Sequence, residues 1–187
     1  VFHETPLCSV FRPHTAAEIE PALHRFGLQW GRYLLSVGTL EPRKNLSALA
    51  AAFAGLPTDL RRRYPLVIVG TPGWRHAAVD RRLAALAREG SVRILGHVPD
   101  VALPAVYAGA AAFAYLSIYE GFGLPVIEAL ASGVPVLAAD TPSLVEVADG
   151  AAIHVTPHDP ARVSEDLTRL LSDRPLRETL ALDGRRR

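Results

Sequence analysis

Six short apolar runs alternate with helical patterns along this chain of 187 residues. The runs are mostly apolar and rich in Val, Ile and Leu, and they cover residues 33–37, 66–69, 92–95, 111–115, 134–138 and 152–155. Strands that are buried on both faces carry such continuous runs, as in a parallel sheet covered by helices. Apolar stripes of helical spacing fall between or beside them, over residues 18–26, 46–56, 79–86, 160–171 and 176–182. The alternation predicts an α/β fold with a doubly wound, mostly parallel sheet and helices on both faces.

The composition indicates one folded domain and a short preceding segment. Residues 1–32 hold scattered His, Pro and charged residues, so we interpret them as the remnant of a hinge or linker, and we expect residues 33–187 to form the domain. Hydrophobic residues make up 49% of the chain, which is enough for a sizeable core. Because the chain has no Met and starts at Val1, we expect it to be part of a longer protein.

The net charge, the length of the apolar runs and the number of cysteines indicate which partners and which cellular location to expect. The formal net charge of +1 gives no reason to expect a nucleic-acid partner. No apolar run in the sequence approaches the roughly 18 residues of a membrane span, and we do not predict contact with a membrane. Cys8 is the only cysteine, which excludes a disulfide within the chain and fits a reducing compartment, so we expect a cytoplasmic location.

The segment EGFGLPVIE, residues 120–128, follows the fourth apolar run and combines a glycine-rich turn with a helix start. Gly121 and Gly123 allow positive φ angles and a close approach of the backbone to a ligand. Pro125 suits the first position of a helix. The segment therefore predicts a tight turn that leads directly into a helix.

The start of this helix is a candidate site for phosphate. Free N–H groups around Gly123 and Leu124 would point outward at the positive end of the helix dipole. Glu120 and Glu128 lie on either side of these groups, and a carboxylate would repel a phosphate. We expect both carboxylates to accept hydrogen bonds from sugar hydroxyls instead, each worth roughly 1.5–3 kcal/mol. The pattern indicates a phosphate flanked by two sugars, as in a nucleotide-sugar.

Arg43 and Lys44 follow the first apolar run, with Asn45 as a possible N-cap of the next helix. Two cations in this loop could neutralise a diphosphate. A basic pair in a loop is more often a solvated surface feature. The diphosphate interpretation gains weight because the loops at residues 38–45 and 120–124 both follow strands and so lie at the same edge of a parallel sheet.

Other motifs leave alternatives open. In the segment GHVPD, the main chain of Val98 could pair with a nucleobase and the Asp100 carboxylate could accept from guanine; alternatively, Asp100 is the N-cap of the following helix. Trp74 could line the cleft or simply pack. His154 and His158 are separated by a Pro and have no third ligand, so we predict no metal site.

Hydroxyl groups after the fifth apolar run also have two interpretations. Thr141 and Ser143 could contact a ligand at this edge, although local capping is the more common use of such residues. The segment GVPVLAAD at residues 133–140 combines a helix C-cap glycine with a buried strand, which is scaffold.

In this order, the segments GTLEPRKN, VIVG, LGHVPD and SIYEGFGLPVIEALASGVPVLAAD resemble the donor-binding half of family 4 retaining glycosyltransferases with the GT-B architecture. The resemblance covers about residues 33–172. It implies a Rossmann-like C-terminal domain that holds a nucleotide-sugar and faces a second Rossmann-like domain across a cleft.

The resemblance also implies roles for individual residues. Glu120 would contact the transferred sugar, and Lys44 would bind the diphosphate and stabilise the leaving group. Arg43 completes the implied catalytic set, because many members carry an Arg where this chain has Thr39. Within the implied donor-binding set, Glu128 would hold the ribose hydroxyls and Val98 the base. The full set is Glu128, Phe122, Gly123, Leu124, Val98, Asp100, Gly38 and Thr39.

By the same resemblance, the reaction needs no metal and no cofactor. The substrate would be a UDP- or GDP-linked sugar, and the partner would be the protein's own N-terminal acceptor domain, which residues 1–32 cannot contain. We therefore expect the chain to bind a donor nucleotide weakly and to transfer nothing alone. The alternatives are another GT-B activity, such as a sugar phosphorylase or a nucleotide-sugar epimerase, and a non-catalytic nucleotide-binding module.

Overall fold

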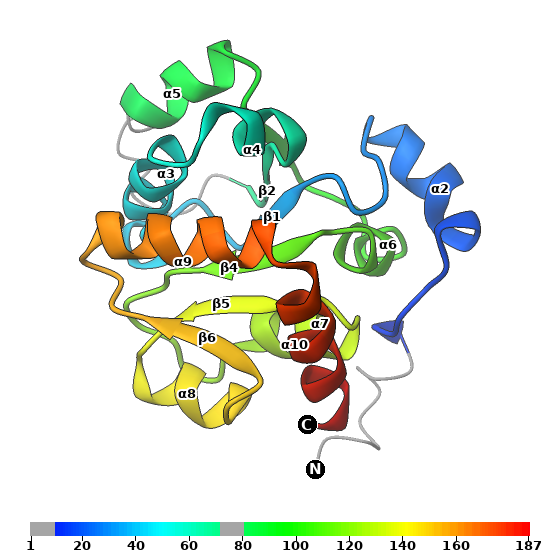
Figure 1. Cartoon of the computed structure of the whole chain (residues 1–187). Helices are drawn as coiled ribbons and strands as arrows, with labels where there is room; N and C mark the ends of the chain where they lie inside the picture. The colour runs from blue at the N-terminus through cyan, green and yellow to red at the C-terminus, as the bar shows by residue number, and fades with distance from the viewer. Residues whose placement is uncertain (1–9, 72–80) are drawn as a thin grey trace.

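The computed structural model describes residues 10–71 and 81–187. Its centre is a six-stranded parallel sheet with the strand order β3-β2-β1-β4-β5-β6 (Figure 1). The strands are β1 Leu34–Val37, β2 Leu66–Val69, β3 Val92–Gly96, β4 Ala112–Tyr115, β5 Val136–Ala139 and β6 Ala152–Val155. The predicted doubly wound α/β fold is confirmed. Each strand begins and ends within two residues of the ends of the apolar run that predicted it.

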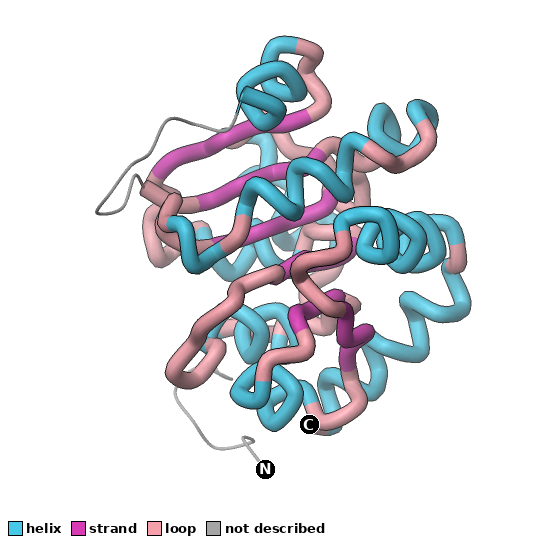
Figure 2. Tube along the Cα trace, turned by 90° about the vertical axis from the view of Figure 1, so that its left-hand side faces the viewer, coloured by secondary structure: helices cyan, strands magenta, loops and turns pink. Residues whose placement is uncertain are grey.

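Helices cover both faces of this sheet, as the view in Figure 2 also shows. They are α2 Ala16–Arg25, η1 Pro42–Lys44 (a 3-10 turn), α3 Leu46–Ala54, α4 Thr58–Arg63, α5 Arg81–Arg88, α6 Leu103–Ala108, α7 Leu124–Ala131, α8 Pro142–Ala148, α9 Pro160–Ser172 and α10 Arg174–Arg186. Helices α3, α4, α5 and α9 share one core with the sheet, and α2, α6, α7 and α8 share the other. Neighbouring strand residues alternate between the two: Leu34 belongs to the first core and Leu35 to the second. This two-sided burial explains why the strands are apolar at successive positions.

Two helical segments differ from the expectation. Helix α4 was not predicted, because it has only six residues and buries only Leu60, so it shows no apolar stripe. The helix expected at residues 79–86 begins partly outside the described residues, where Trp74 also lies; the described part forms α5. Among the described ranges, no helix combines the length and the apolar character needed to cross a bilayer.

Part of the expected linker packs on the domain. Helix α2 lies within residues 1–32, and its Ile19 and Leu23 are buried in the core that includes α6. The backbone N–H of Thr15 donates to the Glu18 carboxylate at 2.6 Å, which stabilises the start of the helix. The domain boundary at residue 32 stays a prediction, but residues 16–25 pack on the domain as a regular helix.

The strand order places β1 next to β4, with Leu34 opposite Ala112 and Leu35 opposite Phe113. The chain winds outward from β1 through β2 and β3, and then returns to start again at β4. In open α/β sheets, ligands bind beyond the carboxyl ends of the strands at such a switch point. The two loops to consider are therefore those that follow β1 and β4.

The loop after β1 is held against the end of β2 by a close backbone contact. A Cβ atom at Gly70 would lie 1.9 Å from the carbonyl oxygen of Gly38, and Gly70 has a φ of 153°. Gly38 N also donates to Val69 O at 2.9 Å. Glycine at position 70 is therefore required for the first loop to leave the sheet on this path.

Replacing Gly70 by Ala tests this close approach. We expect the free energy of unfolding to fall by about 3 kcal/mol or more, because the methyl group overlaps a backbone carbonyl and the φ angle is strained. Chemical denaturation measures the change. Gly90→Ala is the matched control: Gly90 has a φ of 77° with nothing within 4 Å of the added Cβ, so strain alone costs about 1–2 kcal/mol. Equal losses in the two variants would contradict the steric argument.

Candidate functional site

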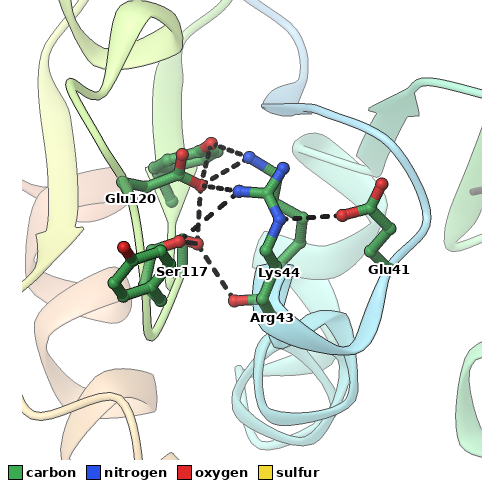
Figure 3. Close-up of polar contacts among 7 residues, drawn as sticks. Glu41, Arg43, Lys44, Ser117 and Glu120 are labelled. Atoms are coloured by element: carbon green, nitrogen blue, oxygen red, sulfur yellow. Dashed lines mark hydrogen bonds and ion pairs between the residues drawn. The ribbon is translucent and has the colours of Figure 1, made fainter.

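The loops that follow β1 and β4 bond directly to each other at the switch point. Ile118 N donates to the carbonyl oxygen of Arg43 at 2.9 Å. Ser117 Oγ lies 3.0 Å from the same oxygen (Figure 3). The first loop can present this carbonyl because it makes a 3-10 turn over Pro42–Lys44 and then reverses at Asn45, whose φ is 53°. The basic pair and the glycine-rich segment are thus neighbours, as the strand pattern predicted.

One oxygen of Glu120 accepts hydrogen bonds from side chains of both loops and of β4 (Figure 3). Four side chains donate to Glu120 Oε1: Arg43 Nη1 at 3.1 Å, Tyr115 OH at 2.7 Å, Ser117 Oγ at 2.7 Å, and the Lys44 ammonium. The side chains of Lys44 and Glu120 are only 8% and 9% exposed. Glu120 Oε2 accepts from no described side chain in these contacts, so it is the carboxylate oxygen still available to a ligand hydroxyl.

The surroundings keep Glu120 ionised. Burial alone would raise its pKa, but hydrogen bonds from Lys44, Ser117 and Tyr115 outweigh this effect and hold the pKa below its ordinary value. Tyr115 behaves in the opposite way, because burial and the adjacent Glu120 carboxylate raise the pKa of its hydroxyl. At neutral pH the site therefore holds a carboxylate and a neutral phenol, and Glu120 is suited to accepting hydrogen bonds rather than to donating a proton.

Glu41 is a member of this cluster that the sequence interpretation missed. Its carboxylate accepts from Arg43 Nε at 2.8 Å, while Arg43 Nη1 reaches Glu120. Two cations and two carboxylates meet here, with Lys44 as the second cation, so their formal charges cancel. The spacing of Glu41 and Arg43, two positions apart in one loop, was the available signal. The sequence pattern did not indicate that Glu120 pairs with both cations, as it does in this structure.

Helix α7 begins directly after this cluster. Its N-cap is Gly123 with a φ of 77°, and Leu124 is its first residue, so the N–H groups of the helix start follow Glu120 within four residues. Two expectations are corrected. Gly121 does not have a positive φ, since Gly123 alone makes the left-handed turn in this segment, and Pro125 is the second helical residue rather than the first.

Glu128 lies one turn further along α7 in a different environment. Burial is the main reason that its pKa is raised; the nearby Asp100 carboxylate raises it further, while the Tyr107 hydroxyl acts in the opposite direction. Tyr107 is fully buried, and its hydroxyl faces Glu128 without completing a hydrogen bond of ordinary geometry. A partly buried carboxylate with few donors has capacity to accept from ligand hydroxyls.

Asp100, Val98 and Asn45 were also predicted to contribute to the site or to cap helices. The interpretation of Asp100 as a helix N-cap is wrong: a turn in which Ala102 N donates to Pro99 O makes Ala102 the N-cap of α6. Asp100 is exposed, and Val98 is buried at 3%. Asn45 occupies the N-cap position of α3, but its side chain donates to Pro157 O at 3.0 Å instead of capping.

Gly38 and Thr39 are the first two residues of the loop that follows β1. A Cβ atom at Gly38 would lie 3.3 Å from Lys44 Cε, so the glycine makes room for the lysine stem. Thr39 O accepts from Glu41 N at 2.8 Å, and the Thr39 side chain helps to lower the pKa of Glu41, second to Arg43. Both residues position the cations, and Thr39 itself carries no charge.

Of the other candidates, Ser143 lies close to the glycine-rich loop. It lines a small cavity of about 100 Å³ with Gly121, Phe122 and Glu146. Thr141 is the N-cap residue of α8, but its buried hydroxyl makes no capping bond. Among residues 10–71 and 81–187, no group of three His, Cys, Asp or Glu side chains is placed to hold a metal ion.

The fold and the paired loops define a Rossmann-like domain with an anion-suited switch point. The family model described as "Glycosyl transferases group 1" matches residues 28–187. The O-antigen chain mannosyltransferase B of Escherichia coli is 41% identical over 176 residues, which cover 94% of this chain and 46% of that relative. The chain therefore belongs to the group 1 glycosyltransferase family, and it spans about half the length of this relative.

Solved structures agree with this fold. The C-terminal domain of the group 1 family protein LpcC from Francisella tularensis aligns with a TM-score of 0.79 at 22% identity, over 96% of this chain and 94% of that one. Anabaena Alr3699/HepE, solved in complex with UDP and glucose, aligns with a TM-score of 0.82 at 20% identity, over 96% of this chain and 49% of that one. At these identities the likeness establishes the shared fold.

The stability of the Glu120 cluster should depend on pH. A carboxylate with a lowered folded pKa stabilises the protein fully above its unfolded pKa and loses this contribution as pH falls through the folded pKa. We expect Glu120→Gln to cost about 1–3 kcal/mol at neutral pH, and the difference from the wild type to shrink below pH 4.5. Urea denaturation at several pH values measures this. Glu20→Gln on the exposed side of α2 controls for the loss of a surface carboxylate; a difference for Glu120→Gln that stayed constant down to pH 2 would refute the assignment.

Proposed function

We propose that this chain is the donor-binding domain of a retaining, metal-independent family 4 glycosyltransferase. In this proposal it holds a nucleoside diphosphate sugar, and the full enzyme transfers the hexosyl group to an acceptor. The observation that carries the proposal is the pairing of Lys44 and Arg43 with Glu120 at the switch point of the sheet, four residues before the start of α7. Membership in the glycosyltransferase family supports the same reaction class.

The charges suggest a role for each group. The first-turn N–H groups at Gly123 and Leu124 bind the diphosphate together with Lys44, which still has one ammonium hydrogen beyond its bonds to Tyr115 and Glu120. As the bond from the sugar to the phosphate oxygen breaks, negative charge grows on the diphosphate, and these groups stabilise it. Glu120 Oε2 accepts from a sugar hydroxyl and orients the ring.

The acceptor hydroxyl loses its proton during the transfer, and a group in the site must accept that proton. Glu120 is a poor base because its pKa is lowered and four donors occupy its other oxygen. We therefore assign this proton to the departing phosphate oxygen, on the face of the sugar where the acceptor also attacks. The bond that forms to the acceptor and the bond that breaks to the phosphate then lie on the same face of the sugar, which retains the anomeric configuration.

Two observations suggest the identity of the donor. The E. coli relative is named a mannosyltransferase, and an exposed Asp100 beside the site could accept from the N–H groups of guanine. We propose a GDP-linked hexose, with mannose as the first sugar to test and UDP-linked sugars as the alternative. Glu128 accepts from the ribose hydroxyls, and the main chain at Val98 meets the base.

The proposed enzyme needs a second domain. The chain spans 46% of the E. coli relative, and half of a cleft neither orients an acceptor nor excludes water. We propose that this chain alone binds nucleotide but transfers no sugar, and that an N-terminal acceptor domain completes the enzyme in the cytoplasm.

The test uses the full enzyme with a panel of GDP- and UDP-linked sugars and several acceptors. NMR of the product should show the anomeric configuration of the donor, with transfer in the presence of EDTA. Inverted product would refute the retaining mechanism, and loss of transfer in EDTA would refute metal independence. Dependence on free phosphate would identify a phosphorylase, and turnover without an acceptor an epimerase. If calorimetry detects no binding of either GDP or UDP to this chain, the donor-binding role itself is wrong.

Glu128 should affect binding and stability in opposite directions. We expect Glu128→Ala to weaken nucleotide binding by about 1–3 kcal/mol, because the ribose hydroxyls lose their acceptor. A raised folded pKa means that the fold disfavours the ionised carboxylate at neutral pH, so Glu128→Gln should increase the free energy of unfolding there. Calorimetry and denaturation measure the two effects. A dideoxy nucleotide that lacks the ribose 2′ and 3′ hydroxyls is the control: its affinity should not change in Glu128→Ala.

A further inference from the structure

Tyr115 is the last residue of β4, and the core fixes the place of its ring. The residue is 2% exposed. Its ring stacks on Phe113 with centroids 5.8 Å apart and planes 22° apart, and Phe113 packs in turn against Tyr107 at 5.5 Å. The hydroxyl therefore projects from a rigid strand, whereas Lys44 and Glu120 lie on loops.

The Tyr115 hydroxyl joins both charged groups of the site. It accepts from Lys44 Nζ at 2.5 Å and donates to Glu120 Oε1 at 2.7 Å. Lys44 Nζ also lies 5.1 Å from the centre of the Tyr115 ring. A hydroxyl has one hydrogen, and only a neutral phenol can donate to a carboxylate while it accepts from an ammonium. Burial and the Glu120 charge raise the pKa of Tyr115, which keeps the phenol in this form.

Ser117 has a different function from Tyr115, although it also donates to Glu120. Its hydroxyl lies within hydrogen-bond distance of the carbonyl oxygens of Arg43 and Tyr119 as well, at 3.0 and 3.2 Å. It thus ties the backbones of the two loops together. Tyr115 is the residue whose side chain contacts the ammonium and the carboxylate at once.

We propose that Tyr115 is a positioning residue for the transfer reaction, whose hydroxyl sets the placement of the Lys44 ammonium and the Glu120 carboxylate relative to each other. The inference rests on the proposed function of these two groups. Without the hydroxyl, Lys44 and Glu120 keep their ion pair, but nothing on a rigid element fixes where that pair lies. Misplacement by about 1 Å can cost a hundredfold in rate.

The enzyme that joins this chain to its acceptor domain allows a direct test with Tyr115→Phe. We expect kcat to fall at least tenfold while the KM for the donor changes less than threefold, because Glu128 and the α7 amides still bind the nucleotide. Tyr33→Phe is the matched control, since it also removes one hydroxyl from a buried tyrosine, here one that donates to Val106 O at 2.6 Å. Its kcat should equal that of the wild type. An unchanged kcat for Tyr115→Phe, or an equal loss in both variants, would overturn the proposal.

A titration separates this inference from the proposed function. In this chain, ¹³C NMR of labelled glutamate should show that the pKa of Glu120 rises in Tyr115→Phe and not in Tyr33→Phe. The charged groups that face Glu120 are Arg43 and Lys44, with Glu41 behind Arg43, and both variants keep them. If the pKa does not move, the positioning role is wrong even when sugar transfer is confirmed. If the pKa moves but the enzyme transfers no sugar, the proposed function fails and the contact stands.

The wild-type chain provides a readout that does not depend on how the variant folds. The Tyr115 hydroxyl proton should appear as a slowly exchanging ¹H resonance with a nuclear Overhauser effect to the Lys44 side chain. A hydroxyl proton that exchanges as fast as that of an exposed tyrosine such as Tyr119 would overturn the proposal.

Discussion

A single carboxylate oxygen holds together the two loops on which this site depends. Glu120 Oε1 accepts from Lys44, Arg43, Tyr115 and Ser117, and the Lys44–Glu120 pair is nearly removed from solvent. Removing one partner of a buried ion pair leaves the other charge uncompensated, which destabilises the fold. The pair therefore constrains the conformation of both loops, together with the contacts of Ile118 N and Ser117 Oγ with Arg43 O.

The sheet makes this closeness possible. Strands β1 and β4 are neighbours although helices α3, α4, α5 and α6 and strands β2 and β3 lie between them in the described part of the chain. Because both strands are parallel, their following loops emerge at the same edge, and the close contact of Gly38 with Gly70 directs the first loop across it. The charged groups of the cluster thus come from segments that are far apart in the chain and that the order of the strands brings together.

The two carboxylates of the glycine-rich segment have opposite environments. Glu120 is stabilised as an anion by its donors, while burial and Asp100 disfavour the anion at Glu128. Carboxylates in one site whose pKa values are pushed apart commonly have different tasks. In the proposed function, Glu120 orients the transferred sugar. Glu128 accepts hydrogen bonds from the ribose hydroxyls of the nucleotide.

The sequence alone determined the fold class, the six strands and most helices, because burial on one or both faces imposes a local apolar period on the residues themselves. It also located the basic pair and the segment EGFGLPVIE after strands of one sheet. Only the tertiary structure decided that Glu120 pairs with Lys44 and Arg43, that Glu41 and Tyr115 belong to the cluster, and that Ala102 rather than Asp100 caps α6. Those outcomes depend on contacts between residues some 70 positions apart and on the exact turn geometry, and neither leaves a periodic trace in the chain.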